Sequence, residues 1–403
     1  MADLDLALDL ARVRAEFPAL GSDFAFFDNA GGSQTLRGVA DRVRDYLLTS
    51  NVQLGASYEV SRAAGARVAA AVAGAAAYVH AASPDEIVLG PSTTQLLANL
   101  ALAMRTWLRP GDEVVVSRAE HEANAGPWCR LAAATGAVVR WWPLDPVTLR
   151  LEPHGLAPLL GPRTRLVAFT HASNLLGTIH DVAGLTALAH GAGARVVVDG
   201  VAYAPHRAID VRAWDVDAYV FSAYKVYGPH LAVLYGKRDL LAPLPGINHD
   251  FIGRDQLAYK LQPGNLNFEL AHGLGGVFAY VDDLGGPAAA FARIAAHEEA
   301  LAAPLLAWLR DAPGVRVLGE ATADRARRVP TISFTVAGRR PEDVVRVVDG
   351  HRVGIRHGDF YARRLVEDLG LADAGGVIRA SMVHYNTHDE VARLIEALAA
   401  ALR

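Results

Sequence analysis

The chain has 403 residues, of which 52% are hydrophobic and 20% charged, so it can bury the cores of two ordinary domains and is not a disordered chain. Its 39 basic and 43 acidic residues give a formal net charge of −4 with no basic run, which argues against nucleic acid or a membrane surface as a partner. No apolar stretch approaches the roughly 20 residues that span a bilayer, and the N-terminal segment lacks the order of a signal peptide, so a cytoplasmic protein is expected.

The N-terminal residues 1–20 follow an amphipathic helical pattern, which predicts an arm that packs on another surface. From about residue 85, short β-rich runs alternate with helical patterns such as Gln95–Leu108 and Val182–Gly191. Strands that are apolar on both faces and separated by helices predict a mainly parallel, doubly wound α/β sheet. The predicted strands are Glu86–Leu89, Glu113–Ser117, Val138–Pro143, Arg165–Thr170, Arg195–Asp199, Ala218–Ser222 and Ala232–Tyr235.

The last third of the chain has a different pattern. A Gly/Pro-rich break at Asp283–Pro287 precedes a long Ala-rich helix, Ala288–Asp311. The strands Val315–Gly319 and Thr331–Val336 and the helix Pro341–Gly350 follow. The sequence therefore predicts an arm (1–20), a large domain (21–283) and a small C-terminal α+β domain (284–403).

Two of the predicted strands end close to residues that can carry chemistry. One ends in Asp199, and the next ends in Ser222, shortly before Lys225. Because open α/β sheets bind ligands at the carboxyl ends of their strands, the carboxylate and the amine are expected in one crevice. Pyridoxal phosphate (PLP) chemistry needs this pair, since a lysine forms an imine with the cofactor and a carboxylate keeps the pyridine nitrogen protonated. An N-cap aspartate or a surface lysine would explain either residue alone; together they indicate a PLP-dependent enzyme acting on an amino acid.

Other strand ends offer groups for the rest of such a cofactor. Thr93 and Thr94 open the helix after the first strand, where backbone N–H groups suit a phosphate, although a plain N-cap is the alternative. Ser222 adds a hydroxyl. His121 could lie flat on the pyridine ring and Asn174 could donate to its hydroxyl oxygen; a satisfied polar histidine and a turn asparagine are the alternatives.

These segments together resemble the class V aminotransferase group of fold-type I PLP enzymes, in its cysteine desulfurase-like branch. The similarity runs from Phe26–Ala30 to Arg379–Thr387. It implies a PLP-binding lysine at Lys225, a homodimer with shared active sites, and a guanidinium clamp for the substrate α-carboxylate at Arg379. The other implied roles are the ring nitrogen partner (Asp199), the ring-stacking histidine (His121), the ring hydroxyl contact (Asn174) and the phosphate contacts (Thr93, Thr94, Ser222).

The chain departs from the desulfurase pattern at several places. Tyr224 stands where a histidine is common, and its hydroxyl can still reach the phosphate. Ala202 replaces a ring-contacting glutamine. Asn265 is the expected substitute for a threonine that reaches the neighbouring subunit's phosphate. The loop Gly354–Ala362, where desulfurases carry their persulfide cysteine, has none.

The single cysteine, Cys129, is expected to be a packing thiol, so it forms neither an internal disulfide nor a persulfide. The chain also resembles a fungal member of this branch, a decarboxylative aldolase of the ustiloxin type. The shared motifs are Gly90–Thr94, Val201–Arg207, Ile247–His249 and the spacing of Gly264 from Phe268-Glu269-Leu270.

The expected reaction therefore takes place at Cβ of a small L-amino acid, with decarboxylative aldol chemistry on L-aspartate and an aldehyde as the first choice. A C–S lyase without a persulfide cysteine, and an aminotransferase or epimerase, share the same first steps. A non-catalytic PLP-binding or regulatory protein is the remaining class. The expected substrate-binding set is Arg379, Arg356, His249 and Asn29, with His357 and Arg207 as further cations and ordinary surface charge as the alternative.

Overall fold

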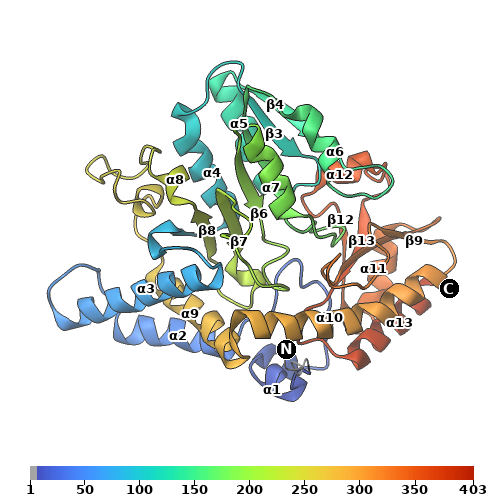
Figure 1. Ribbon diagram of the computed structural model, residues 1–403. Helices are drawn as coiled ribbons and strands as arrows, with labels where there is room; N and C mark the ends of the chain where they lie inside the picture. Colours follow the sequence, from blue (N-terminus) through green and yellow to red (C-terminus); the bar gives the residue numbers. More distant parts are fainter. Residues whose placement is uncertain (1–6) are drawn as a thin grey trace, which may run out of the picture.

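The computed structural model describes residues 7–403 and contains a large seven-stranded sheet between helices and a smaller four-stranded sheet (Figure 1). The large sheet has the order β2-β8-β7-β6-β5-β3-β4, and β8 alone runs antiparallel to its neighbours. Its strands are β2 (Ile87–Gly90), β3 (Glu113–Ser117), β4 (Val138–Trp142), β5 (Thr164–Thr170), β6 (Arg195–Asp199), β7 (Ala218–Ser222) and β8 (Ala232–Gly236). The predicted mainly parallel α/β sheet is thus confirmed, and no strand end lies more than one residue from its predicted position.

The strands of this sheet are apolar throughout because helices cover both faces. Successive side chains of a strand point to opposite faces, so Val114 and Val116 join one core while Val115 joins the other. The helices on the Val114 face are α4 (Thr93–Ala103) and α5 (Gly126–Thr135). The opposite face carries α2 (Arg37–Thr49), α3 (Glu59–Tyr78), α7 (Val182–Gly191) and α9 (Phe268–Asp283). Each fully buried Val or Leu contributes about 1.5–3 kcal/mol, so the sheet is a rigid platform for the residues at its edge.

The C-terminal part begins with the long helix α10 (Gly286–Asp311), which crosses beneath both sheets in Figure 1. Its antiparallel sheet has the order β12-β13-β10-β9. These strands are β9 (Val315–Leu318), β10 (Thr331–Val336), β12 (Arg356–Gly358) and β13 (Val377–Ser381), and the helices are α11 (Pro341–Asp349), α12 (Arg363–Asp368) and α13 (His388–Leu402). The short helices α6 (Pro153–Leu156) and α8 (Arg238–Leu241) pack against the large sheet. The predicted domain boundaries stay predictions.

The N-terminal segment links the two parts. Residues 1–6 of the predicted arm lie outside the described residues, and the arm continues as α1 (Leu10–Ala15). Phe17 packs in the large core, and Arg14 forms an ion pair with Glu390 at 3.0 Å, so the arm packs on its own chain. The strand β1 (Ala25–Phe26) then pairs in parallel with β11 (Val353–Gly354). No helix within residues 7–403 is long and apolar enough to cross a membrane.

The strand order brings several carboxyl ends to one place. Ser222 at the end of β7 pairs with Ala232, which pairs with Gly90 at the end of β2. The ends of β6 and β5 follow on the other side of β7, because Thr170 pairs with Asp199. The helix α4 begins directly after β2, so its N-terminus points to the same edge.

Candidate active site

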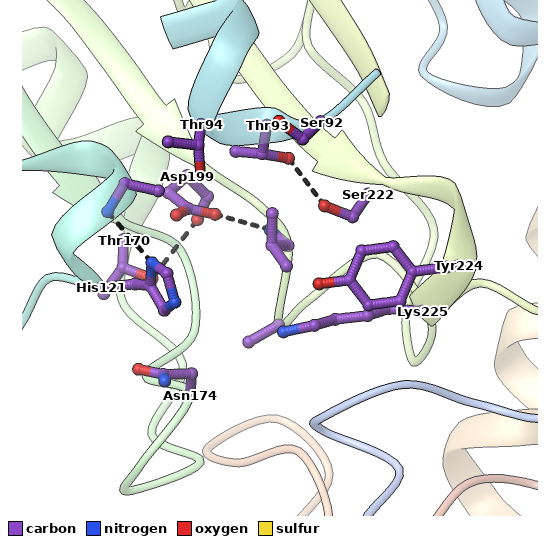
Figure 2. A pocket seen from close by; sticks show the side chains of 13 residues that line it. Ser92, Thr93, Thr94, His121, Thr170, Asn174, Asp199, Ser222, Tyr224 and Lys225 are labelled. Atoms are coloured by element: carbon purple, nitrogen blue, oxygen red, sulfur yellow. Dashed lines mark hydrogen bonds between the residues drawn. The ribbon is translucent and has the colours of Figure 1, made fainter. Parts of the chain in front are cut away.

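A pocket of about 500 Å³ opens at this edge of the large sheet (Figure 2). Eight of the predicted site residues line it: Thr93, Thr94, His121, Asn174, Asp199, Ser222, Tyr224 and Lys225. Ser92, Ala123, Thr170, Val201 and Ala202 complete the lining. The structure therefore gathers residues from five separate segments of the chain in one place.

Lys225 lies on a short 3₁₀ turn, Ala223–Lys225, that follows β7, and it is buried. Burial lowers the pKa of its amine to about 8, and the positive charge of Arg379 acts in the same direction. Within residues 7–403, its Nζ has no hydrogen bond or ion pair. A buried lysine is normally paired, so a lysine without a partner at a pocket wall is available to react.

Asp199 ends β6 and is also buried. Its Oδ1 accepts a hydrogen bond from the backbone N–H of Val201 at 2.8 Å. The second oxygen, Oδ2, borders the pocket and has no hydrogen bond within the described residues. Burial raises the pKa of this carboxyl to about 6, so it is ionised at neutral pH. A free carboxylate oxygen in an apolar surrounding is a suitable acceptor for a protonated ring nitrogen.

Hydroxyl groups gather at one end of the pocket, while Asn174 lies at the other end (Figure 2). Ser92 caps α4, where its hydroxyl accepts from the backbone N–H of Gln95 at 3.1 Å. The Thr93 and Ser222 hydroxyl oxygens lie 2.8 Å apart and share a hydrogen bond. Free N–H groups and the positive end of the helix dipole favour an anion at such a helix N-terminus. This end of the pocket suits a phosphate.

His121 lies on the wall of the pocket opposite Tyr224 (Figure 2). Its Nδ1 accepts from the backbone N–H of Ala123 at 3.0 Å, which fixes the ring. Burial lowers the pKa of His121 to about 4, with the charges of Lys225 and Arg379 adding to the effect, so the imidazole is neutral at pH 7.

Glu120 is a buried residue that sequence reasoning missed. Its carboxyl accepts from Thr170 N–H at 2.8 Å and from Asn124 Nδ2 at 2.6 Å, and it also bonds to Ser117. Burial raises its pKa to about 8 despite these donors. The carboxyl ties the end of β3 to the end of β5 and so fixes the turn that carries His121. An acidic residue directly before a strand-end histidine is the signal that could have identified it.

Three charged side chains, those of Arg379, Arg356 and Asp28, form a cluster beside the Asn174 end of the pocket. Arg379 in β13 is buried, and its Nη1 donates to the carbonyl of Asn174 at 3.0 Å, a direct link to the pocket wall. Its Nη2 donates to Asp28 Oδ1 at 2.8 Å. Arg356 lies opposite Arg379 in the β12–β13 pair, with its Nη1 3.7 Å from Asp28 Oδ2. Asp28, which sequence reasoning did not single out, thus binds two guanidinium groups.

Five other predicted residues do not line the pocket of this chain: Asn29, Arg207, His249, Asn265 and His357, the last of which lies in β12. Asn29 is buried and donates to the carbonyls of Phe26 and Ser381, both at 2.9 Å. Arg207 pairs with Glu298 in α10 at 2.8 Å. His249 stacks on Phe251, and Asn265 bonds to Gln53 at the surface.

The comparison with known families agrees with this geometry, since the aminotransferase class-V model matches residues 25–394. The chain belongs to the class-V aminotransferase family. This class-V enzyme is similar to the aminotransferase-like protein FGM3 of Gibberella zeae, with 44% identity over 97% of this chain and 98% of the relative. It is 36% identical to the cysteine desulfurase-like protein ustD of Aspergillus flavus, over 96% and 89% of the two chains.

Among solved structures, the class-V enzyme is similar to the cysteine desulfurase CsdA of Escherichia coli, with 30% identity and a TM-score of 0.86 over 98% of this chain and 99% of that one. The family and fold-type I fold expected from the sequence are therefore confirmed, and the chain is a PLP-dependent enzyme of the cysteine desulfurase-like group. The pocket fits PLP because a free buried amine, a free carboxylate oxygen and a cluster of hydroxyls at a helix N-terminus face one cavity.

Proposed function

We propose that this class-V enzyme joins Cβ of L-aspartate to the carbonyl carbon of an aldehyde, with loss of the β-carboxylate as carbon dioxide. L-Aspartate and R–CHO give a γ-hydroxy-α-amino acid and carbon dioxide, so the reaction needs no oxidant or reductant. The observation that carries the proposal is the contact of both Arg379 and Arg356 with the single carboxylate of Asp28. Because both guanidinium groups lie beside one carboxylate, they are also close enough to each other to bind the two carboxylates of one substrate, one each.

The proposed cofactor contacts follow the groups around the pocket. Of the residues that line the pocket, Thr93, Thr94, Ser222 and Tyr224 would hold the phosphate, and Lys225 would bind the cofactor aldehyde. Asp199 would pair with the ring nitrogen, Asn174 would donate to the ring hydroxyl, and His121, which is neutral, would stack on the ring. When bound, PLP supplies an aromatic ring that accepts the electron pair released from the substrate carbon.

The protein's own groups then divide the remaining work. Arg379 binds the α-carboxylate and fixes the orientation of Cα, while Arg356 binds the β-carboxylate until it leaves as a neutral molecule. The Lys225 amine takes the Cα proton. Its pKa of about 8 leaves a sizeable neutral fraction near neutral pH, which a general base requires.

The position of the thiol supports chemistry that needs no protein persulfide. The loop Gly354–Ala362 carries no cysteine, and Cys129 lies on α5. Burial raises the pKa of the Cys129 thiol, which reduces the thiolate needed for sulfur transfer.

A C–S lyase that eliminates sulfide from L-cysteine without a protein thiol is the second candidate. The similarity to proteins named as cysteine desulfurases favours it, since one α-carboxylate and one Cα proton are all that its first steps need. An aminotransferase or epimerase shares those steps.

We also propose a cytoplasmic homodimer with shared active sites. Leu47 and Leu48 of α2 are exposed, and they line an apolar hollow with Pro229, close to the turn of Lys225. A second copy of the chain on this surface would bury these leucines beside the active site. Asn265, exposed on this chain, would then be available to the partner's phosphate.

The test is incubation of the PLP-loaded enzyme with L-aspartate and benzaldehyde, and separately with L-cysteine. Carbon dioxide release, together with a new amino acid whose mass equals that of L-aspartate plus benzaldehyde minus carbon dioxide, would support the proposal. Sulfide and pyruvate from L-cysteine, with L-aspartate unchanged, would replace it by the C–S lyase. Lys225→Ala should abolish either reaction and serves as the background control.

A further inference from the structure

The loop after β12 holds two consecutive aromatic residues in a backbone conformation that bulky side chains rarely adopt. Phe360 has φ of 52° and Tyr361 has φ of 58°, both in the left-handed region. Such residues persist only where the surrounding structure holds them, and they concentrate at functional sites.

Hydrogen bonds from the active site hold this loop. The N–H of Tyr361 donates to Asp359 Oδ1 at 2.9 Å, and its carbonyl accepts from the N–H of Glu122 at 2.8 Å. The carbonyl of Phe360 accepts from Asn174 Nδ2 at 3.0 Å. Two pocket segments, the one after β3 and the one after β5, therefore fix both strained residues.

The consequence is that the two aromatic side chains lie in different environments. Phe360 is 9% exposed, and its ring centre is 3.7 Å from the Arg379 guanidinium carbon. Tyr361 is 67% exposed, with its ring centre 5.3 Å from that of His121. Phe360 supports the carboxylate clamp, whereas Tyr361 presents an aromatic surface beside the pocket wall.

Tyr361 also borders a second hollow outside the pocket. The hollow is lined by Glu122, Asp359, Tyr361, Arg363, Arg364 and Glu367. Its arginines are engaged, since Arg363 pairs with Glu367 at 2.8 Å and Arg364 pairs with Glu122. The Tyr361 ring is thus an apolar surface in this hollow, and it touches the residue that lines the active-site pocket next to it.

We propose that Tyr361 is a specificity-determining residue for the second substrate, an aldehyde with a flat aromatic or apolar body. The inference rests on the proposed aldol-type function. The body of the aldehyde stacks on the Tyr361 ring in the outer hollow, and its carbonyl carbon enters the pocket past His121. Aromatic pairs of this kind gain energy beyond the area that they bury. Tyr361 does not line the pocket that holds Lys225 and Asp199, so it acts on the aldehyde and not on the amino acid.

The test uses PLP-loaded enzyme and the variants Tyr361→Ala and Tyr361→Phe. Three quantities are measured: the KM for benzaldehyde, the KM for acetaldehyde, and the rate at which L-aspartate is decarboxylated to alanine without aldehyde. Tyr361→Ala should raise the KM for benzaldehyde about tenfold and leave the other two within twofold. Tyr361→Phe keeps the ring and should match the unmodified enzyme in all three.

Two results would overturn the inference while the aldol function stands. One is an equal KM change for benzaldehyde and acetaldehyde in Tyr361→Ala. The other is a Tyr361→Phe variant as impaired as Tyr361→Ala, which would assign the effect to the hydroxyl. If the unmodified enzyme forms no product from L-aspartate, the proposed function fails and this inference fails with it.

Discussion

Replacement of Asp199 by asparagine isolates one charge at the centre of the site. Asp199 Oδ1 accepts from Val201 N–H at 2.8 Å, and the asparagine carbonyl can keep that bond. The change therefore affects only Oδ2, which borders the pocket without a partner within the described residues. The local fold should persist while the negative charge is lost.

The expected loss follows from the strength of a charged hydrogen bond. Such a bond contributes about 1.5–3 kcal/mol, and about 1.4 kcal/mol corresponds to a factor of ten, so turnover at pH 8 should fall about 10- to 150-fold. Burial raises the pKa of Asp199 to about 6, and a positive ring nitrogen beside it would lower that value. The acid limb of the pH–rate profile should lie at or below pH 6 in the unmodified enzyme and be absent in Asp199→Asn.

The assay is steady-state consumption of L-aspartate with saturating aldehyde, with PLP content measured by visible absorbance so that turnover is expressed per loaded site. Asp210→Asn is the matched control, because Asp210 also accepts a backbone N–H, from Ala213 at 2.9 Å, but lies at the surface. It should stay within twofold. An Asp199→Asn enzyme with full cofactor and turnover within threefold would refute the role of this charge.

Four further changes test other parts of the site. Lys225→Ala should keep the far-UV circular dichroism spectrum but lose turnover and the visible absorbance of bound PLP that remains after gel filtration. Retained turnover would show that Lys225 neither binds the cofactor nor removes the Cα proton. Arg356→Gln should raise the KM for L-aspartate about fivefold and leave that for L-cysteine unchanged, a modest effect because the arginine is 57% exposed and screened by solvent. Cys129→Ser should leave all rates within twofold, and a large loss of sulfide release would restore a persulfide mechanism. Burial raises the pKa of Glu120 from 4.5 to about 8, so its protonated form stabilises the fold, and the free energy of unfolding should fall progressively between about pH 4.5 and pH 8, by up to about 5 kcal/mol. Glu120→Gln should lose less in Tm between pH 5 and pH 9 than the unmodified enzyme, and parallel Tm curves would contradict the raised pKa.

The sequence by itself determined the large sheet and the core of its site. Apolar runs of strand length, separated by helical patterns, predict buried parallel strands, because both the burial and the period are local properties of the chain. The positions of Asp199 and Lys225 follow from the same local pattern, since a residue at the end of a buried strand must lie at the edge of the sheet.

Only the tertiary structure decided which polar residues are free and which are already satisfied. Asn29 and Arg379 both lie in segments that resemble the family, yet Asn29 is used up by backbone carbonyls while Arg379 lies against the pocket wall. Asp28 and Arg379 are 351 positions apart, and no local pattern indicates that they pair. The same holds for Tyr361 beside His121. Strand positions depend on neighbours in the chain, whereas the state of a charged or aromatic side chain depends on what long-range packing brings to it.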